Sequence, residues 1–275
     1  MNVVKKVRHF VLLHRLKHRK IPLKLWHQTI AKMPLMQRYT SSERMRIRLL
    51  AGEVLRRKPI IPVQGMILTD EIRIMLATQA AMLVFGFESV EDDLSLDWLR
   101  NWNQIVVYPT PFRNGRENLL SVDGFLVSWA GVESGETRYQ GGIIIDWQDD
   151  EPHPLHRYAN QVLMHEMAHK LDMLDGYTNG HPPLHAQMSE KVWFEVFEAA
   201  YKDLTKQIKL GKKTAINPYA ATNAAEFFAV MTEYFFESPQ VLNRVYPKVY
   251  QQLVLFYKQE PLPKCHLSRQ ESASN

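Results

Sequence analysis

The chain has 275 residues, a length that suits one large domain or one domain with an appended subdomain. Hydrophobic residues make up 45% and charged residues 23%, and no apolar run is long enough to cross a membrane, so the composition is typical of a globular protein without a membrane span. The net charge is +5, and the single cysteine, Cys265, excludes an intrachain disulfide, which favours a reducing cytoplasm.

The N-terminal segment is strongly basic. Residues 1–60 contain 16 lysines and arginines but only two acids, Glu43 and Glu53, so this segment carries +14. Such asymmetry is found in proteins that contact nucleic acid, anionic lipid or an acidic protein. It is equally typical of solvated faces of amphipathic helices, because the basic residues alternate with apolar ones. The apolar stretch at residues 10–13 is too short for the core of a signal peptide, so we expect no secretory leader.

Residues 1–95 are predicted to be mostly helical. Thr40 and Glu43 have the spacing of a capping box, and a helix with apolar residues follows them. Residues 59–65, which contain two prolines and a glycine, are predicted to be a connector. A further helix is predicted over residues 69–85, with a threonine cap at its start and a glycine after its end.

Three short strands are predicted in the middle of the chain. Residues 105–108 are rich in β-branched side chains, and residues 124–130 and 139–147 are further candidates. We expect residues 133–136 to form a hairpin turn between the second and third strands. Together the strands are expected to form a small mixed sheet.

The C-terminal half is predicted to be helical, with a polar, frayed tail at residues 261–275. The predicted helices cover residues 156–174, 187–210, 224–236 and 239–257. Gly176 follows the first of them as a stop signal, and Ser189 is placed to cap the second.

The strongest chemical signal is the run from His165 to His169 in the first of these helices. Residues four apart share one helical face, so both imidazoles can point at one metal ion. A catalytic zinc ion takes nitrogen and oxygen ligands and keeps one position for water, whose pKa falls to about 7. Glu166 is then placed to accept a proton from that water. The alternative is a pair of core histidines with Glu166 in an ion pair, which suits a helix apolar on nearly all sides less well.

Three acids are candidates for the third metal ligand. Asp172 lies on the same face of the helix, but as a ligand it would strain a straight helix, so we interpret it as a partner of a histidine or as a surface acid. Glu190 follows the second histidine by 21 residues, at an exposed helix start. Glu226 precedes a strongly apolar helix and is favoured over Glu190, although it could instead complete a capping box with Asn223.

Two further side chains are placed to assist such a site. Tyr219 precedes Glu226 by seven residues and could donate to the oxyanion formed when water attacks a carbonyl, although it could also be an ordinary turn tyrosine. Glu233 follows Glu226 by seven residues, on the same helical face. It is either the hydrogen-bond partner of a ligand histidine or a solvated acid.

At these residues the sequence resembles a known family. The run 165–176, together with residues 217–219, 223–229 and 143–147, is similar to the Mlc titration factor A family of zinc metallopeptidases, bacterial gluzincins related to the catalytic domain of anthrax lethal factor. The likeness extends over most of the chain. It implies aminopeptidase activity on small substrates. It also implies binding to the glucose repressor Mlc, which relieves repression of the glucose phosphotransferase system.

The resemblance also implies a role for each site residue. His165, His169 and Glu226 would hold one zinc ion per chain, Glu166 would be the general base, and Tyr219 would be the transition-state donor. This strengthens the preference for Glu226 as the third ligand.

We therefore expect an α+β protein with a zincin-like metallopeptidase core, containing the small mixed sheet and the active-site helix. The whole chain is expected to form one unit. Within it, residues 1–95 would be a helical N-terminal part, residues 100–260 the catalytic core and residues 261–275 a flexible tail.

Two classes of function follow. In the first, a zinc peptidase binds its peptide as an added strand beside residues 141–145, where glycines allow close approach, and Glu133, Glu136 or Asp146 holds the free α-amino group. In the second, a non-proteolytic regulator sequesters a partner protein, and the zinc site is secondary. Specific nucleic-acid binding is not expected, because no helix-turn-helix or zinc-finger spacing is present.

Overall fold

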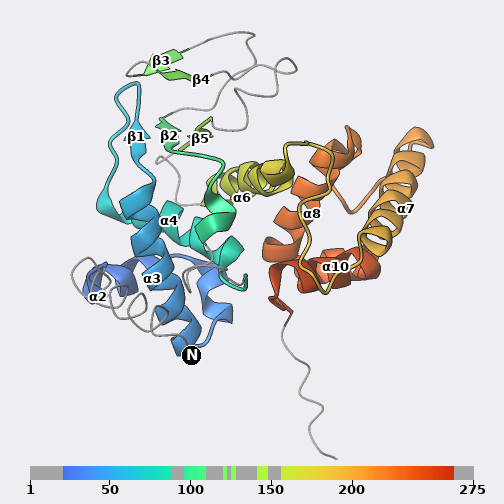
Figure 1. The fold of residues 1–275 in the computed structure, drawn as a ribbon, viewed down its shortest axis with the longest axis horizontal. Coiled ribbons are helices and arrows are strands. Elements are labelled where there is room, and N and C mark those ends of the chain that lie inside the picture. Colours follow the sequence, from blue (N-terminus) through green and yellow to red (C-terminus); the bar gives the residue numbers. More distant parts are fainter. Residues whose placement is uncertain are drawn as a thin grey trace, which may run out of the picture.

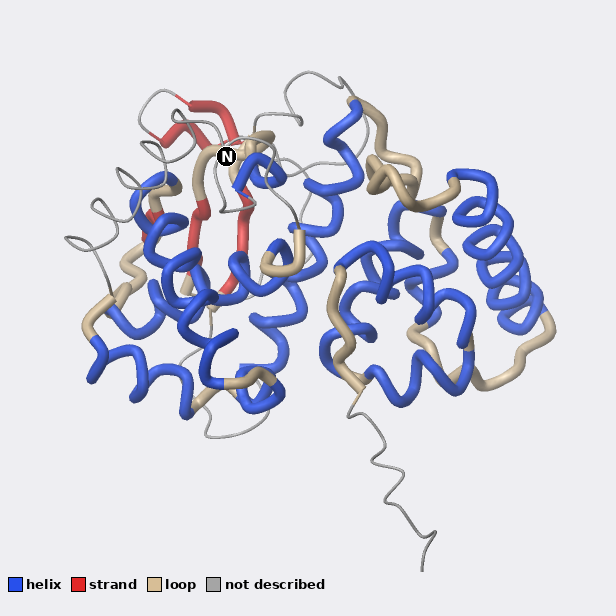
Figure 2. Tube along the Cα trace, turned by 60° about the horizontal axis from the view of Figure 1, so that its bottom comes forward, coloured by secondary structure: helices blue, strands red, loops and turns tan. Residues whose placement is uncertain are grey.

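The computed structural model of the chain describes residues 21–87, 96–109, 120–122, 125–127, 141–147 and 156–262. Helices predominate in these ranges, and the strands gather in one half of the molecule, as Figures 1 and 2 show. None of the described helices combines the length and the hydropathy needed to cross a bilayer.

The N-terminal part contains the predicted helices. They are α2 (Leu23–Ala31), the 3-10 turn η1 (Pro34–Arg38), α3 (Ser41–Arg57) and α4 (Asp70–Val84). The capping box is confirmed, because the Thr40 side chain accepts from the Glu43 N–H and the Glu43 carboxylate accepts from the Thr40 N–H at 2.7 Å. Thr69 caps α4, whose residues are nearly all buried, so α4 is the central helix of this half.

A small parallel sheet lies beside these helices. It consists of β1 (Ile60–Pro62), β2 (Ile105–Tyr108) and β5 (Ile143–Asp146), in the order β1-β2-β5. Every residue of the central strand β2 is buried, as is usual when both faces of a parallel sheet are covered. The 3-10 turn η2 (Leu96–Leu99) precedes β2. The fold is thus helix-rich with a small parallel sheet.

Three predictions about this sheet were wrong. The sheet is parallel rather than mixed in the described residues, and part of the connector at residues 59–65 is the edge strand β1. Proline at a strand end concealed β1, since a proline is tolerated at a sheet edge but resembles a turn signal. The predicted hairpin pairing is not found among the described strands either: β4 (Phe125–Val127) pairs with β3 (Leu120–Val122), while β5 pairs with β2. The proposed turn at residues 133–136 lies outside the described residues.

The C-terminal half is built from α6 (His156–Asp172), η3 (Met173–Asp175), α7 (Glu190–Lys209), η4 (Pro218–Ala221), α8 (Ala224–Glu237), α9 (Pro239–Val245) and α10 (Pro247–Tyr257). The stop at Gly176 and the cap at Ser189 are confirmed. The single helix predicted over residues 239–257 is wrong. Pro247 has no N–H to continue α9 and forces Tyr246 out of the helical conformation.

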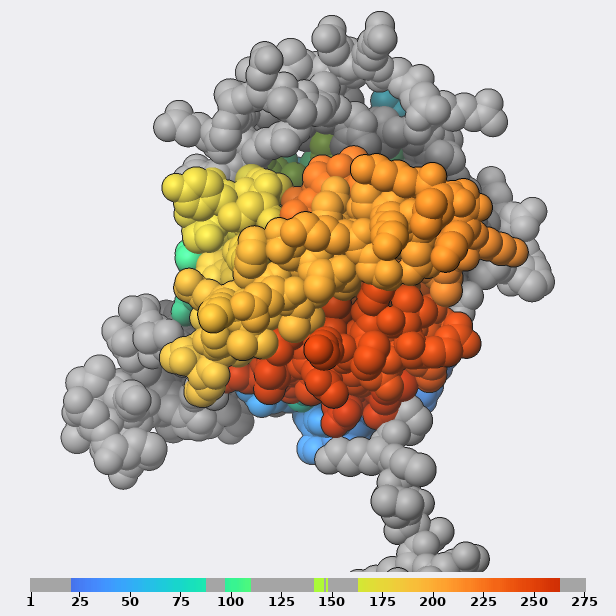
Figure 3. Space-filling view, turned by 90° about the vertical axis from the view of Figure 1, so that its right-hand side faces the viewer, coloured from blue at the N-terminus to red at the C-terminus, as the bar shows by residue number. Residues whose placement is uncertain are grey.

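Helix α6 joins the two halves. It packs on α4 and β5 on one side and on α8 on the other, while α7 and α10 form the outer face shown in Figure 3. A cluster of buried aromatic rings fills the space between α7, α8 and α10; it comprises Trp193, Phe197, Phe228, Phe235, Phe256 and Tyr257. The buried face of α8 is therefore packed against α7 and α10.

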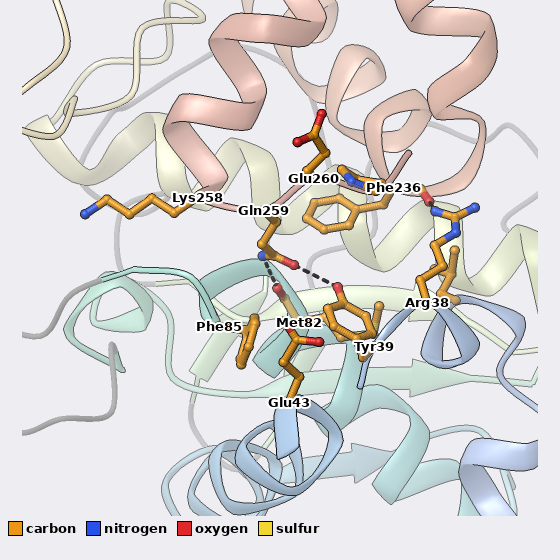
Figure 4. Close-up of a pocket in the computed structure, with 11 residues that line it drawn as sticks. Arg38, Tyr39, Glu43, Met82, Phe85, Phe236, Lys258, Gln259 and Glu260 are labelled. Carbon is orange, nitrogen blue, oxygen red and sulfur yellow. Dashed lines mark hydrogen bonds between the residues drawn. The ribbon is translucent and has the colours of Figure 1, made fainter. Parts of the chain in front are cut away.

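A second junction connects the residues after α10 to the N-terminal helices (Figure 4). Gln259 accepts a hydrogen bond from the Tyr39 hydroxyl at 2.7 Å and donates one to the Met82 carbonyl at 2.8 Å. Arg38 donates to the carbonyl of Phe236 in the last turn of α8. The residues that make these bonds line a cavity of about 220 Å³. The N-terminal helices thus contact the C-terminal end of α8.

Candidate metal centre

The two histidines project from the same face of α6. The positions around them, including Leu163, Met164 and Ala168, are fully buried, so apolar contacts fix the rotation of the helix about its axis. The side chains of His165 and His169 remain 13% and 16% exposed, and their Nε2 atoms lie 3.1 Å apart. The predicted i, i+4 pair is therefore formed and opens toward solvent.

Glu226 approaches this pair from the first turn of α8. Its Oε2 atom lies 2.9 Å from His165 Nε2 and 3.4 Å from His169 Nε2. Asn223 caps α8 by accepting a hydrogen bond from the backbone N–H of Glu226 at 2.9 Å. The capping alternative is thus resolved, because asparagine caps the helix while the glutamate carboxylate faces the histidines.

These three side chains fit a metal ion. A tetrahedral ion with bonds of about 2.0–2.1 Å requires ligand atoms roughly 3.3 Å apart, close to the three separations observed. Glu226 Oε2 is buried and accepts no hydrogen bond of good geometry, which is what a ligand oxygen without its ion would show. In the described part of the chain, no other group of three His, Cys, Asp or Glu side chains converges in this way.

Within the cluster, opposite charges offset the effect of burial on the pKa values of its side chains. Burial alone would raise the pKa of Glu226, but the two imidazoles hold that pKa well below its usual range. Burial alone would lower the pKa of His165, but the carboxylates of Glu226 and Glu233 raise it to about 10. A positive charge is therefore stabilised between these side chains, as a proton or as a cation.

Glu233 holds the far side of the His165 ring. Its Oε1 atom lies 2.6 Å from His165 Nδ1, and its side chain is only 19% exposed, so it is not a solvated acid. A carboxylate at Nδ1 fixes the proton on that nitrogen and leaves Nε2 free to bind a metal. Because Glu226 and Glu233 lie two turns apart on α8, one helix supplies both carboxylates.

The other two acids lie outside the cluster. Glu190 is exposed at the start of α7. Asp172 is fully buried, which corrects its interpretation as a surface acid, and burial raises its pKa to about 6. It accepts a hydrogen bond from the Gly180 N–H at 2.8 Å, so it anchors the loop that follows α6.

Gly180 is a structural residue that the sequence did not single out as important. Its carbonyl accepts from the Trp193 indole at 3.2 Å, and its φ is +77°. A Cβ atom at this position would lie only 2.4 Å from the carbonyl oxygen of Ala224, the first residue of α8. Gly180 therefore ties the end of α6 and α7 to the helix that carries Glu226.

Tyr219 and Glu166 flank the cluster. The Tyr219 ring lies 6.0 Å from the His165 ring and is 51% exposed, on η4, where Asn217 accepts its N–H at 3.0 Å. Burial first, and then the nearby carboxylate of Glu226, raise the pKa of Tyr219 to about 12, so its hydroxyl keeps its proton at neutral pH. The Glu166 carboxylate is near enough to raise the pKa of both Tyr219 and His165, so it lies close to the cluster.

The features predicted to bind substrate are only partly described. Glu133 and Glu136 lie outside the described residues, as does the side chain of Asp146. A Cβ atom at Gly142 would lie 2.9 Å from the Gln104 side chain, so the glycine lets the chain before β5 pack closely on the residue before β2. Among the described strands β5 pairs only with β2, and the addition of a peptide strand beside it stays a prediction.

The sequence matches one family model and several relatives of known name. The family model of the glucose-regulated metallo-peptidase M90 matches residues 5–258. Three relatives named Mlc titration factor A are each 34% identical over 245 residues, which is 87% of this chain and 86% of the relative. They come from Yersinia pestis strain Pestoides F and from Yersinia pseudotuberculosis serotypes O:1b (strain IP 31758) and O:3 (strain YPIII). The matched region contains the whole metal cluster.

Proposed function

The chain belongs to the glucose-regulated metallo-peptidase family M90, the family of Mlc titration factor A, and we propose that it is a zinc-dependent peptidase with a zincin-like core. The observation that carries the proposal is the convergence of His165, His169 and Glu226 from two helices onto one point. Two imidazoles and one carboxylate are the ligand set of a catalytic zinc site. One ion per chain is expected.

The chain's own residues divide the remaining work. A bound zinc ion would polarise the peptide carbonyl and lower the pKa of water to about 7. Glu166 accepts the proton from the attacking water and delivers it to the leaving amine. Tyr219, protonated at neutral pH, donates its hydroxyl toward the oxyanion. Glu233 keeps the His165 ring in the orientation that presents Nε2.

We further propose aminopeptidase specificity. This requires an acid that binds the free α-amino group, and Glu133, Glu136 and Asp146 remain the candidates. Short substrates with a free amino terminus would then be hydrolysed faster than blocked ones.

A regulatory role is proposed on the basis of the relatives. Their name, Mlc titration factor A, describes an interaction with Mlc, and this chain would bind a similar transcriptional repressor. The alternative function is a non-proteolytic regulator that sequesters this partner without cleaving anything. The two functions differ in whether Glu166 is needed.

Zinc content and hydrolysis of an alanine-anilide test the peptidase function together. We expect about one zinc per chain in the wild type, loss of both zinc and activity in Glu226→Gln, and loss of activity alone in Glu166→Gln. Zinc retained in Glu226→Gln would exclude Glu226 as a ligand. Glu190→Gln is the matched control and should keep both properties. Repressor binding that survives in Glu166→Gln, with no hydrolysis in any variant, would favour the sequestering function.

A further inference from the structure

The end of α7 carries a basic surface that the peptidase function does not use. We call it the lysine ridge, and it consists of Lys202, Lys206, Lys209, Lys212 and Lys213, all exposed. Lys202 pairs with Glu198 at 2.9 Å, whereas the other four have no ion-pair partner among the described residues. The first half of α7 differs, because there Lys191 lies 3.9 Å from Glu195. Positive charge is thus concentrated at one end of the helix.

A groove of about 400 Å³ runs along this ridge. Its lining includes Tyr201, Thr205 and Leu210 between the lysines, and Leu210 is 61% exposed. Lysines in a last turn also offset the helix dipole, which accounts for Lys206 and Lys209 without any ligand. The dipole does not account for an exposed leucine among lysines, nor for the two lysines beyond the helix. A groove that combines basic side chains with an exposed apolar one is complementary to a segment with acidic and apolar side chains.

The short turn η4 connects the groove beside the ridge to the metal centre. The Tyr201 hydroxyl donates to the Ala221 carbonyl at 3.2 Å, and Ala221 is the last residue of η4. The same short turn carries Tyr219, whose ring faces His165. A peptide that extends from the metal centre across η4 therefore meets α7, which crosses the exposed face in Figure 3.

We propose that the lysine ridge binds an acidic segment of the peptide substrate whose scissile bond lies at the metal centre. Carboxylates of the segment pair with Lys206 and Lys209, and an apolar side chain rests on Tyr201 and Leu210. A peptide is favoured over nucleic acid because the ridge contains no arginine, and the one aromatic ring in the groove, that of Tyr201, is only partly exposed for stacking with a base. This inference rests on the proposed peptidase function.

Binding measured without hydrolysis tests the ridge. Fluorescein-labelled peptides of four alanines followed by Leu-Glu-Glu-Leu-Glu-Glu, or by the same segment with Gln for Glu, are titrated with the Glu166→Gln protein and followed by fluorescence anisotropy. We expect the acidic peptide to bind about tenfold more tightly than its neutral counterpart, with an advantage that shrinks at high salt. The double variant K206E/K209E should weaken acidic-peptide binding about tenfold and leave neutral-peptide binding unchanged.

A matched control makes the same charge change elsewhere. Lys24 on α2 and Lys248 on α10 are exposed, and K24E/K248E should leave acidic-peptide binding within about twofold. If both double variants weaken acidic-peptide binding equally, the proposal that the ridge is the binding site is wrong, because the effect would then come from the net charge of the protein. Tighter binding of a short DNA duplex that K206E/K209E abolishes would overturn the peptide assignment. A third outcome is that the acidic peptide binds through the ridge while the wild-type protein hydrolyses no anilide. This result would contradict the peptidase proposal but not the binding of acidic segments by the ridge.

Discussion

The metal centre and the junction of Figure 4 both place polar side chains between packed helices, but they treat those side chains differently. At the junction, Gln259 uses its oxygen and its nitrogen in hydrogen bonds to Tyr39 and Met82. At the metal centre, three ligand atoms converge and Glu226 Oε2 has no well-directed hydrogen bond. Polar groups that satisfy one another stabilise a fold, whereas polar groups that converge without doing so are arranged for a ligand.

The largest effect on stability and on zinc binding is expected at Gly180, which packs against the start of the helix that carries Glu226. Gly180→Ala would place a methyl group against the Ala224 carbonyl and strain a positive φ, so it should cost about 3 kcal/mol of unfolding free energy and displace Glu226. Urea unfolding and zinc titration measure both effects. Gly65→Ala is the control, since Gly65 has a φ of +78° but open space around it, and it should cost about 1 kcal/mol and leave zinc affinity unchanged. Unchanged zinc affinity in Gly180→Ala would show that the loop does not position Glu226.

A smaller effect is expected at Glu233. Glu233→Gln weakens the hold on His165 Nδ1, so zinc affinity should fall about 10–100-fold while the protein stays folded. Competition with a chelator measures this, with circular dichroism as the check on folding. An affinity equal to that of the wild type would make Glu233 a structural residue like those of the junction.

In the N-terminal half, the pH dependence of stability tests a polar side chain that is satisfied by backbone carbonyls, Lys58. Lys58 bonds to the carbonyls of Leu99 and Trp102, and burial first, then Arg57, lower its pKa from 10.5 to about 8. Between pH 8 and 10.5 the unfolded chain keeps a proton on Lys58 that the folded chain does not, so the contribution of Lys58 to the free energy of unfolding should rise with pH, by about 1–2 kcal/mol after allowing for solvent screening, relative to a variant without this lysine. Lys58→Met should lack this rise. An identical pH profile in both proteins would mean that Lys58 titrates normally.

The smallest effect is expected at the junction itself. Tyr39→Phe removes one satisfied hydrogen bond to Gln259 and should cost about 1 kcal/mol of unfolding free energy without changing zinc content. Thermal unfolding measures the loss of stability, and elemental analysis measures the zinc content. Loss of zinc in this variant would mean that the junction and the metal centre are not separable.

The sequence predicts best what is local. The caps at Thr40, Thr69 and Ser189, and the pairing of His165 with His169, depend on residues at most four positions apart, where helix geometry sets the contact. The residues alone favoured Glu226 over Glu190 because Glu226 precedes a strongly apolar helix, and the likeness to a known family strengthened that preference before its contact with the histidines was known.

What the sequence did not reveal depends on distant contacts. The pairing of β1 with β2 joins strands that are separated in the chain by helix α4. No residue of β1 indicates which strand it pairs with. The buried carboxylate of Asp172 finds its hydrogen-bond donor in an N–H eight residues away, at Gly180. Pro247 is a different case, because its signal is local and the break after α9 was visible in the sequence.

Helix α8 carries Glu226 and Glu233 seven residues apart, which is close to two turns, and this spacing has an evolutionary consequence. A single residue inserted or deleted between them would rotate one carboxylate by about 100° away from His165. The interval of seven residues can therefore accept substitutions but no change of length. Length variation among homologues should be excluded from α8 and concentrated in turns such as Gly211, where φ is +67° and no neighbouring atom lies near.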